Sequence, residues 1–155
     1  MKKGKLRGFT LIEIIVVIAI IGALAAIIIP SIIGYTHQAR AAVITGNARN
    51  VYNAAKMAVL ESFEQKNINP GEIYIGDDSG TAHAVGGSDD LSVGKFMGDD
   101  FEGHYAFVIS DGGNDVDYAV WSNNYAINQS DVRVYSANEI EADVTGRGIG
   151  SYPNS

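Results

Sequence analysis

Residues 9–29 form a nearly unbroken apolar run close to the start of the chain, and Glu13 is the only charged residue within it. In a helix, the 21 residues of this run cover roughly 32 Å, enough to cross a hydrocarbon core of about 30 Å. The apolar core of a cleaved secretory signal is shorter, at about 7 to 15 residues. The length of the run therefore predicts a transmembrane helix.

The residues that precede this run predict its orientation in the membrane. Four cations occur there, namely Lys2, Lys3, Lys5 and Arg7. Because positively charged flanks remain on the cytoplasmic side, we expect a cytoplasmic start and a C-terminal body outside the cytoplasm.

A second pattern follows Pro30, where the missing N–H and the ring of proline are expected to kink the helix. Apolar residues recur there at three- and four-residue spacing, which predicts an amphipathic helix over residues 30–66 that ends before the turn Asn69-Pro70-Gly71. The expected buried face comprises Ile32, Tyr35, Ala39, Ala42, Val43, Val51, Ala54, Ala55, Ala58, Val59 and Phe63.

The remaining residues, 67–155, have the pattern of a loop followed by a small antiparallel sheet. Short segments rich in aromatic and β-branched residues, bounded by Gly, Asn and Asp, occur at residues 72–76, 105–110, 117–122 and 131–136. Residues 110–115 are expected to connect two of them as a hairpin. A small sheet needs an apolar cover, which the amphipathic helix can provide. The fold class predicted is therefore α+β.

Charge and composition exclude several classes of function. The formal net charge is −7, and without the four N-terminal cations seven cations face eighteen acids, a net charge of −11. Such an acidic body repels phosphate backbones, so we expect no nucleic-acid partner. The chain has no cysteine, which excludes disulfides and thiolate metal sites.

Glu13 is the feature that most needs an explanation. Fourteen of the 21 residues in the apolar run are Ile, Leu, Val or Phe, which favour insertion by roughly 4 to 8 kcal/mol in total. A carboxylate costs on the order of 2.5 to 3.5 kcal/mol at the helix centre, so insertion is still favourable. No Lys or Arg occurs between Arg7 and Arg40. The nearest cation would be a new amino terminus on Phe9, created by cutting after Gly8.

The N-terminal residues, with a basic leader over 1–8 followed by Gly8, Phe9, Thr10-Leu11-Ile12-Glu13 and the apolar run, closely resemble the class III signal of type IV prepilins. The resemblance implies that a prepilin peptidase cuts between Gly8 and Phe9 and methylates the Phe9 amine. It also implies that Glu13 neutralises the Phe9 amine of a neighbouring subunit in the filament. The stretch between Gly22 and Pro30 can lose helix on assembly in this family, whose members share the fold expected above.

Other candidate sites are weaker. His37, His83 and His104 are too scattered to suggest zinc, and the Asp77-Asp78-Ser79-Gly80 segment lacks the spacing and partners of a serine nucleophile, so we expect no enzyme. Calcium is a candidate ligand, because one short loop carries four residues with side-chain oxygen atoms, namely Asp111, Asn114, Asp115 and Asp117. Their spacing does not match a twelve-residue calcium loop. No other cofactor is expected.

Three functions follow from these observations. The first is a structural subunit of a type IV pilus, exported, cleaved, N-methylated and polymerised with copies of itself by a membrane assembly machinery into a surface filament for adhesion, motility or biofilm formation. The second is a pseudopilin of a type II secretion system, whose N-terminus obeys the same rules. The third is a membrane-anchored binding domain that never polymerises, in which residues 9–29 serve only as an anchor in the lipid.

Overall fold

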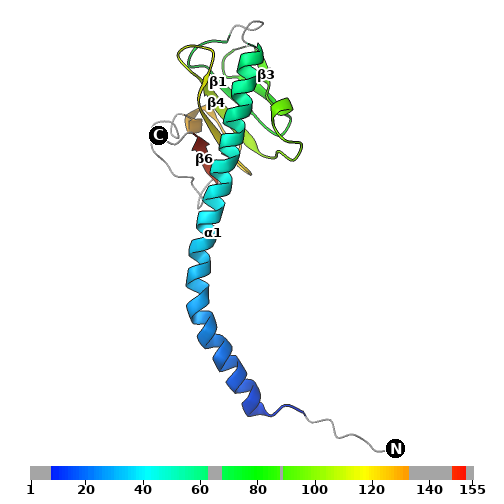
Figure 1. The fold of residues 1–155 in the computed structure, drawn as a ribbon, viewed down its shortest axis with the longest axis vertical. Helices are drawn as coiled ribbons and strands as arrows, with labels where there is room; N and C mark the ends of the chain where they lie inside the picture. The colour runs from blue at the N-terminus through cyan, green and yellow to red at the C-terminus, as the bar shows by residue number, and fades with distance from the viewer. Residues whose placement is uncertain (1–7, 63–67, 88, 133–147, 153–155) are drawn as a thin grey trace, which may run out of the picture. The chain divides into compact units, whose positions relative to one another are not determined.

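The computed structural model describes residues 8–62, 68–87, 89–132 and 148–152, and these form one long helix and a six-stranded sheet (Figure 1). The helix α1 spans Leu11–Ser62. The chain divides into two compact units, Met1–Gln38 and Ala39–Ser155. The predicted α+β class is confirmed. The finer segment boundaries at residues 8, 29 and 66 stay predictions, and the expected helix end near Lys66 lies outside the described residues.

The second unit contains the whole sheet, and every pairing in it is antiparallel. The strands follow one another across the sheet in the order β3-β2-β1-β4-β5-β6. Their bounds are β1 Ile73–Gly76, β2 Thr81–Ala84, β3 Asp90–Ser92, β4 His104–Ile109, β5 Val116–Ser122 and β6 Ile149–Tyr152, with a 3₁₀ turn η1 at Gly94–Phe96.

The part of α1 that belongs to this unit covers one face of the sheet. Its buried residues are Ile44, Ala48, Val51, Ala54, Ala55, Ala58 and Val59. Four of the seven are alanines, which let the helix backbone approach the strands closely. Opposite them lie large side chains from the sheet, including the stacked rings of Tyr74 and Phe107, whose centroids are 5.2 Å apart.

The expected buried face of the helix is confirmed in its C-terminal part and wrong in its N-terminal part. Val51, Ala54, Ala55, Ala58 and Val59 are buried as predicted. The first five predicted positions are instead exposed, namely Ile32, Tyr35, Ala39, Ala42 and Val43. A helical stripe is buried only where another element lies against it, and the sheet covers α1 from Ile44 onward. The last predicted position, Phe63, lies outside the described residues.

Three of the four predicted strands are confirmed within a residue as β1, β4 and β5. The predicted hairpin between β4 and β5 is also confirmed, because Ser110 N–H donates to the carbonyl of Asp115 at 2.9 Å. The sequence pattern missed β2, β3 and β6, which are three or four residues long and partly polar. Such strands depend on pairing with neighbours rather than on local preference.

The fourth predicted strand, at residues 131–136, is wrong where the structure describes it. Residues 129–132 are helical, and residues 133–136 lie outside the described part. Asn128 begins this turn, because its Oδ1 accepts the backbone N–H of Ser130 and Asp131, while Asp131 accepts the N–H of Asn128 at 3.1 Å. This reciprocal capping box favours a helix start over an extended strand.

Candidate processing and assembly site

Gly8 and Phe9 precede α1 and are open to solvent. The Phe9 side chain is 85% exposed, although it is a large apolar group. A Cβ atom added to Gly8 would meet no other atom within 4 Å, so the folded chain gives no steric reason for glycine at this position. The Gly8–Phe9 peptide bond is therefore accessible to an external protein.

Thr10 and Glu13 form a capping box at the start of α1. The backbone N–H and the hydroxyl of Thr10 both donate to Oε2 of Glu13, at 2.8 and 2.7 Å. In return, the backbone N–H of Glu13 donates to the Thr10 hydroxyl oxygen, with 3.4 Å between nitrogen and oxygen. This is the Thr-x-x-Glu arrangement that satisfies the free N–H groups of a helix start. The Glu13 carboxylate thus has donors within its own chain.

Glu13 was predicted from the sequence, whereas the role of Thr10 was not. The spacing of Thr and Glu three residues apart, directly before an apolar run, was sufficient to find it. The Lys2 to Arg7 leader lies outside the described residues. No Lys or Arg occurs from Gly8 to Gln38, so the described part of the first unit offers Glu13 hydrogen bonds but no Lys or Arg side chain.

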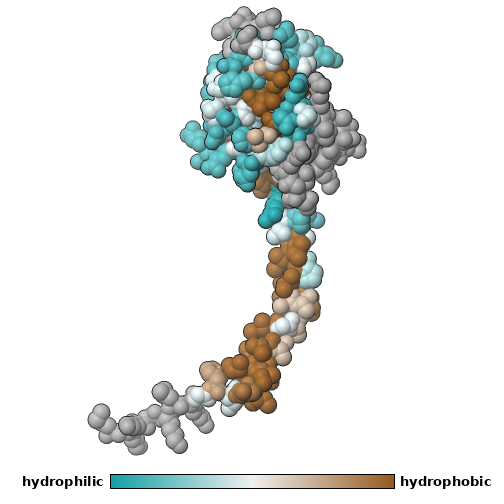
Figure 2. All heavy atoms as spheres, turned by 180° about the vertical axis from the view of Figure 1, so that it is seen from behind, coloured by the Kyte–Doolittle hydropathy of each residue, from teal (hydrophilic) through white to brown (hydrophobic). Residues whose placement is uncertain are grey.

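The helical part of the first unit has no polar side chain over residues 14–29 and is therefore apolar around its circumference there, and Figure 2 shows hydrophobic residues along the face in view. Its large side chains remain at least half exposed, from Ile14 at 50% to Leu11 at 77%. By length and composition, α1 is apolar enough to cross a membrane. A helix that is apolar around its whole circumference needs lipid or other protein around it, so this surface is suited to membrane anchoring and to packing against further chains.

Gly22 and Pro30 lie inside α1, which continues through both. A Cβ atom on Gly22 would meet nothing within 4 Å, so close packing within the chain does not require glycine there. Pro30 supplies no N–H to the carbonyl four residues earlier, that of Ala26. These are weak points of a continuous helix, and both the kink at Pro30 and the loss of helix between Gly22 and Pro30 on assembly stay predictions.

The four calcium candidates are on the β4–β5 connection and the start of β5. Asp115 is bound by the ammonium group of Lys56, whose Nζ lies 2.9 Å from Oδ1, and by the N–H of Val116. Asp111, Asn114 and Asp117 are exposed. Among the described residues, no group of three or more His, Cys, Asp or Glu side chains could hold a metal ion. Calcium binding at this loop stays a prediction, and thermal melting with and without millimolar calcium would check it.

Comparison with known proteins supports the interpretation of the N-terminus. Residues 4–29 match the family model described as the prokaryotic N-terminal methylation motif. The chain is 38% identical over 63 residues to the type II secretion system core protein G of Pseudomonas aeruginosa, covering 41% of this chain and 44% of that protein. It is 43% identical over 58 residues to a fimbrial protein of Pseudomonas aeruginosa, covering 37% of this chain and 38% of that protein.

A longer match exists to the type IV major fimbrial protein FimA of Dichelobacter nodosus, 35% identical over 103 residues, which covers 66% of this chain and 57% of that protein. Each match spans less than two thirds of the relative's length. No solved structure matches the chain. The resemblance to type IV prepilins is confirmed, and the matches include both pilus proteins and a secretion-system protein.

Proposed function

We propose that this chain, which carries the prokaryotic N-terminal methylation motif, is a structural subunit of a type IV pilus. The observation that carries the proposal is the exposed helical surface of residues 11–29, which is apolar except for the Glu13 carboxylate. Alone in a membrane, this surface needs only lipid. In a filament, the same surfaces of neighbouring copies cover one another, and the carboxylate acquires a defined partner.

The proposed maturation begins at the exposed Gly8–Phe9 bond. A prepilin peptidase cuts it and methylates the new Phe9 amine, which leaves a cation at the first residue of the mature chain. Glycine at position 8 then serves the peptidase, since the folded chain has no need of it. A methylated secondary amine keeps its positive charge, so it can still pair with a carboxylate.

Glu13 then changes partner during assembly. Before polymerisation, Thr10 supplies hydrogen bonds to its carboxylate, which lowers the cost of holding Glu13 in lipid. In the filament, the Phe9 amine of a neighbouring copy provides an opposite charge in a surrounding of low dielectric constant, where such a pair is strong. Only a neighbour in the correct axial position brings its amine to Glu13, so the pair also selects the register of the subunits.

The proposed location follows from the two ends of the molecule. The basic leader remains cytoplasmic, α1 anchors the subunit in the membrane, and the acidic C-terminal unit lies outside the cytoplasm until the subunit joins an extracellular pilus. The partners are copies of the same chain, the peptidase, the assembly machinery and membrane lipid. The matched relatives bear the names of fimbrial and secretion-system proteins rather than enzymes, and we propose a non-enzymatic role.

A pseudopilin of a type II secretion system is the second candidate. The match to core protein G of Pseudomonas aeruginosa favours it, since it is of the same extent as the match to the fimbrial protein of that organism. A membrane-anchored binding domain that does not polymerise is the third candidate, and it would require neither cleavage nor a partner for Glu13.

Mass spectrometry of N-terminal peptides from the sheared surface fraction of cells and from their membranes separates the three. A peptide that begins with N-methylated Phe9, recovered from extracellular filaments, is the result expected for a pilus subunit. Processed chains confined to the membrane fraction would contradict it and favour the pseudopilin. An intact Met1 to Gly8 leader on all membrane-bound chains would contradict both filament proposals and leave the simple anchor.

A further inference from the structure

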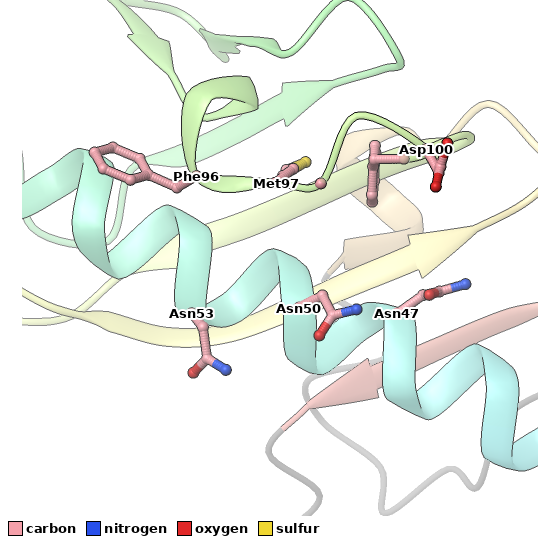
Figure 3. A pocket seen from close by; sticks show the side chains of 8 residues that line it. Asn47, Asn50, Asn53, Phe96, Met97 and Asp100 are labelled. Atoms are coloured by element: carbon pink, nitrogen blue, oxygen red, sulfur yellow. The ribbon is translucent and has the colours of Figure 1, made fainter.

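A groove of about 400 Å³ lies in the second unit, between α1 and the segment that follows η1 (Figure 3). Three asparagines form the α1 side, and the other side has apolar side chains together with the Asp100 carboxylate. We call it the asparagine groove, and the residues that characterise it are Asn47, Asn50, Asn53, Met97, Asp100 and Phe101. The volume falls within the range of small-molecule sites in proteins.

The asparagines have no role in folding that the structure reveals. Asn47, Asn50 and Asn53 are three residues apart, so each is a neighbour of the next on the surface of α1. They lie well inside a helix that runs from Leu11 to Ser62, where asparagine is an unfavourable residue and no helix end needs a cap. Among the described residues, none of these amides has a hydrogen-bond partner. All three line one groove, although Figure 3 shows the Asn53 side chain directed away from Met97 and Asp100.

The opposite wall has a different chemistry. Met97 and Phe101 are half-buried and provide apolar surface, and Phe101 is held by its edge-on contact with the buried ring of Tyr105, at 5.6 Å between centroids. The backbone N–H of Phe101 donates to the carbonyl of Gly98 at 3.0 Å, which shapes the turn that carries Asp100. Figure 3 shows Met97 and Asp100 across from the row of asparagines.

A ligand for this groove must offer hydrogen-bond donors and acceptors together with an apolar face. Each amide provides one acceptor oxygen and two donor hydrogens, and the Asp100 carboxylate provides acceptors only. Sugar rings have this combination, because hydroxyl groups both donate and accept while the C–H groups of one ring face are apolar. Asp99 and Asp100, in a body whose net charge is negative, disfavour anionic sugars. We propose that the asparagine groove binds a neutral hexose unit of a glycan.

Sugar binding at this groove does not require polymerisation, so it can be measured on the unassembled full chain in micelles of a phosphocholine detergent, which has no sugar headgroup. Saturation-transfer NMR would use the methyl glycosides of glucose, galactose, mannose and N-acetylglucosamine, with methyl glucuronide as the anionic comparison. We expect at least one neutral glycoside to bind with a millimolar dissociation constant. We expect the glucuronide not to bind. Saturation transfer to none of the neutral glycosides would overturn the proposal.

Variants identify the groove as the site. Asn47→Ala and Asn50→Ala each remove hydrogen-bonding groups and are expected to weaken binding by roughly three- to tenfold. Because alanine favours helix, both variants should melt at the wild-type temperature or above it, which excludes unfolding as the cause of any loss. The matched control is Asn123→Ala, an exposed asparagine after β5 that does not line this groove.

Two further outcomes would overturn the assignment. The first is unchanged glycoside binding in both groove variants, which would place the sugar elsewhere on the chain. The second is that the wild-type chain binds no glycoside while the groove variants no longer form filaments. That second outcome would make the asparagine groove a contact surface for another copy of the chain.

Discussion

The Glu13 carboxylate is held by Thr10 of its own chain, which donates both its backbone N–H, at 2.8 Å, and its hydroxyl, at 2.7 Å. One pair of residues therefore starts the helix and satisfies an acid within an apolar segment. Neither hydrogen bond supplies a positive charge, so the carboxylate can still gain by pairing with a cation. This arrangement agrees with a subunit that is tolerated in lipid and stabilised further in a filament.

Replacing Glu13 should separate maturation from assembly. We expect Glu13→Gln to insert, to be cut between Gly8 and Phe9, and to yield at least about tenfold fewer filaments, because the neutral amide cannot pair with an amine in low dielectric. Mass spectrometry would verify the cut, and the protein in the sheared fraction would give the filament yield. Thr10→Ser, which keeps the hydroxyl, is the control and should assemble. Normal filament yield from Glu13→Gln would contradict the proposed role.

Gly80 and Gly94 are packed against each other and should not tolerate side chains. A Cβ atom on Gly80 would lie 2.7 Å from the Cα of Gly94, and Gly80 also has a φ of 76°. We expect Gly80→Ala and Gly94→Ala each to lower the free energy of unfolding by about 1 to 3 kcal/mol. Urea unfolding of the detergent-solubilised chain, followed by the fluorescence of Trp121, measures this change.

Gly98→Ala is the control for that pair, because its Cβ would meet nothing within 4 Å and its φ is not positive. It should leave the free energy of unfolding unchanged or raise it by up to about 1 kcal/mol. Equal effects of all three substitutions would show that the close approach of Gly80 and Gly94 is not what disfavours alanine.

The ion pair of Lys56 and Asp115 joins α1 to the β4–β5 hairpin. Both side chains are more than a third exposed, so we expect a coupling free energy of only about 0.2 to 1 kcal/mol. A double-mutant cycle of Lys56→Met and Asp115→Asn, measured by urea unfolding, gives this value. Asp117→Asn, a neighbouring exposed acid, is the control and should show no coupling to Lys56.

The same coupling should depend on pH at both extremes. The Lys56 ammonium lowers the pKa of Asp115 below its ordinary value of 3.8, so the contribution is complete above that value and is lost as pH falls through the lowered pKa. The hydrogen bond to Asp115 raises the pKa of Lys56 above 10.5, so the contribution is lost as pH rises through the raised pKa. A coupling that fell between pH 5 and pH 9 would contradict this assignment.

The alanines of α1 set the closeness of its packing on the sheet. Ala55 is fully buried, so Ala55→Leu adds volume where the helix and strands already touch. We expect the free energy of unfolding to fall by about 1 to 3 kcal/mol, measured as above. Met57→Leu changes an exposed side chain two residues away and should alter it by less than about 0.5 kcal/mol. A stabilised Ala55→Leu variant would indicate unfilled space at this interface.

Local patterns were sufficient to predict much of this protein. The apolar run of residues 9–29, Gly8, Phe9 and Glu13 were all recognisable from composition and spacing within a few residues. The strands β1, β4 and β5 were predicted because each is an apolar, β-branched or aromatic segment between turn residues. Even the Thr10 cap, which was not predicted, is a pattern within four consecutive residues.

Features that depend on distant contacts could not be predicted in this way. The apolar spacing along α1 does not show that burial begins at Ile44 rather than Ile32, because the extent of the sheet sets that limit. The short strands β2, β3 and β6 exist through hydrogen bonds to their neighbours. Lys56 and Asp115 are 59 positions apart, and the asparagine groove needs residues near 50 and 100 on facing segments. Contact between remote segments is a property of the folded chain, which short-range spacing does not encode.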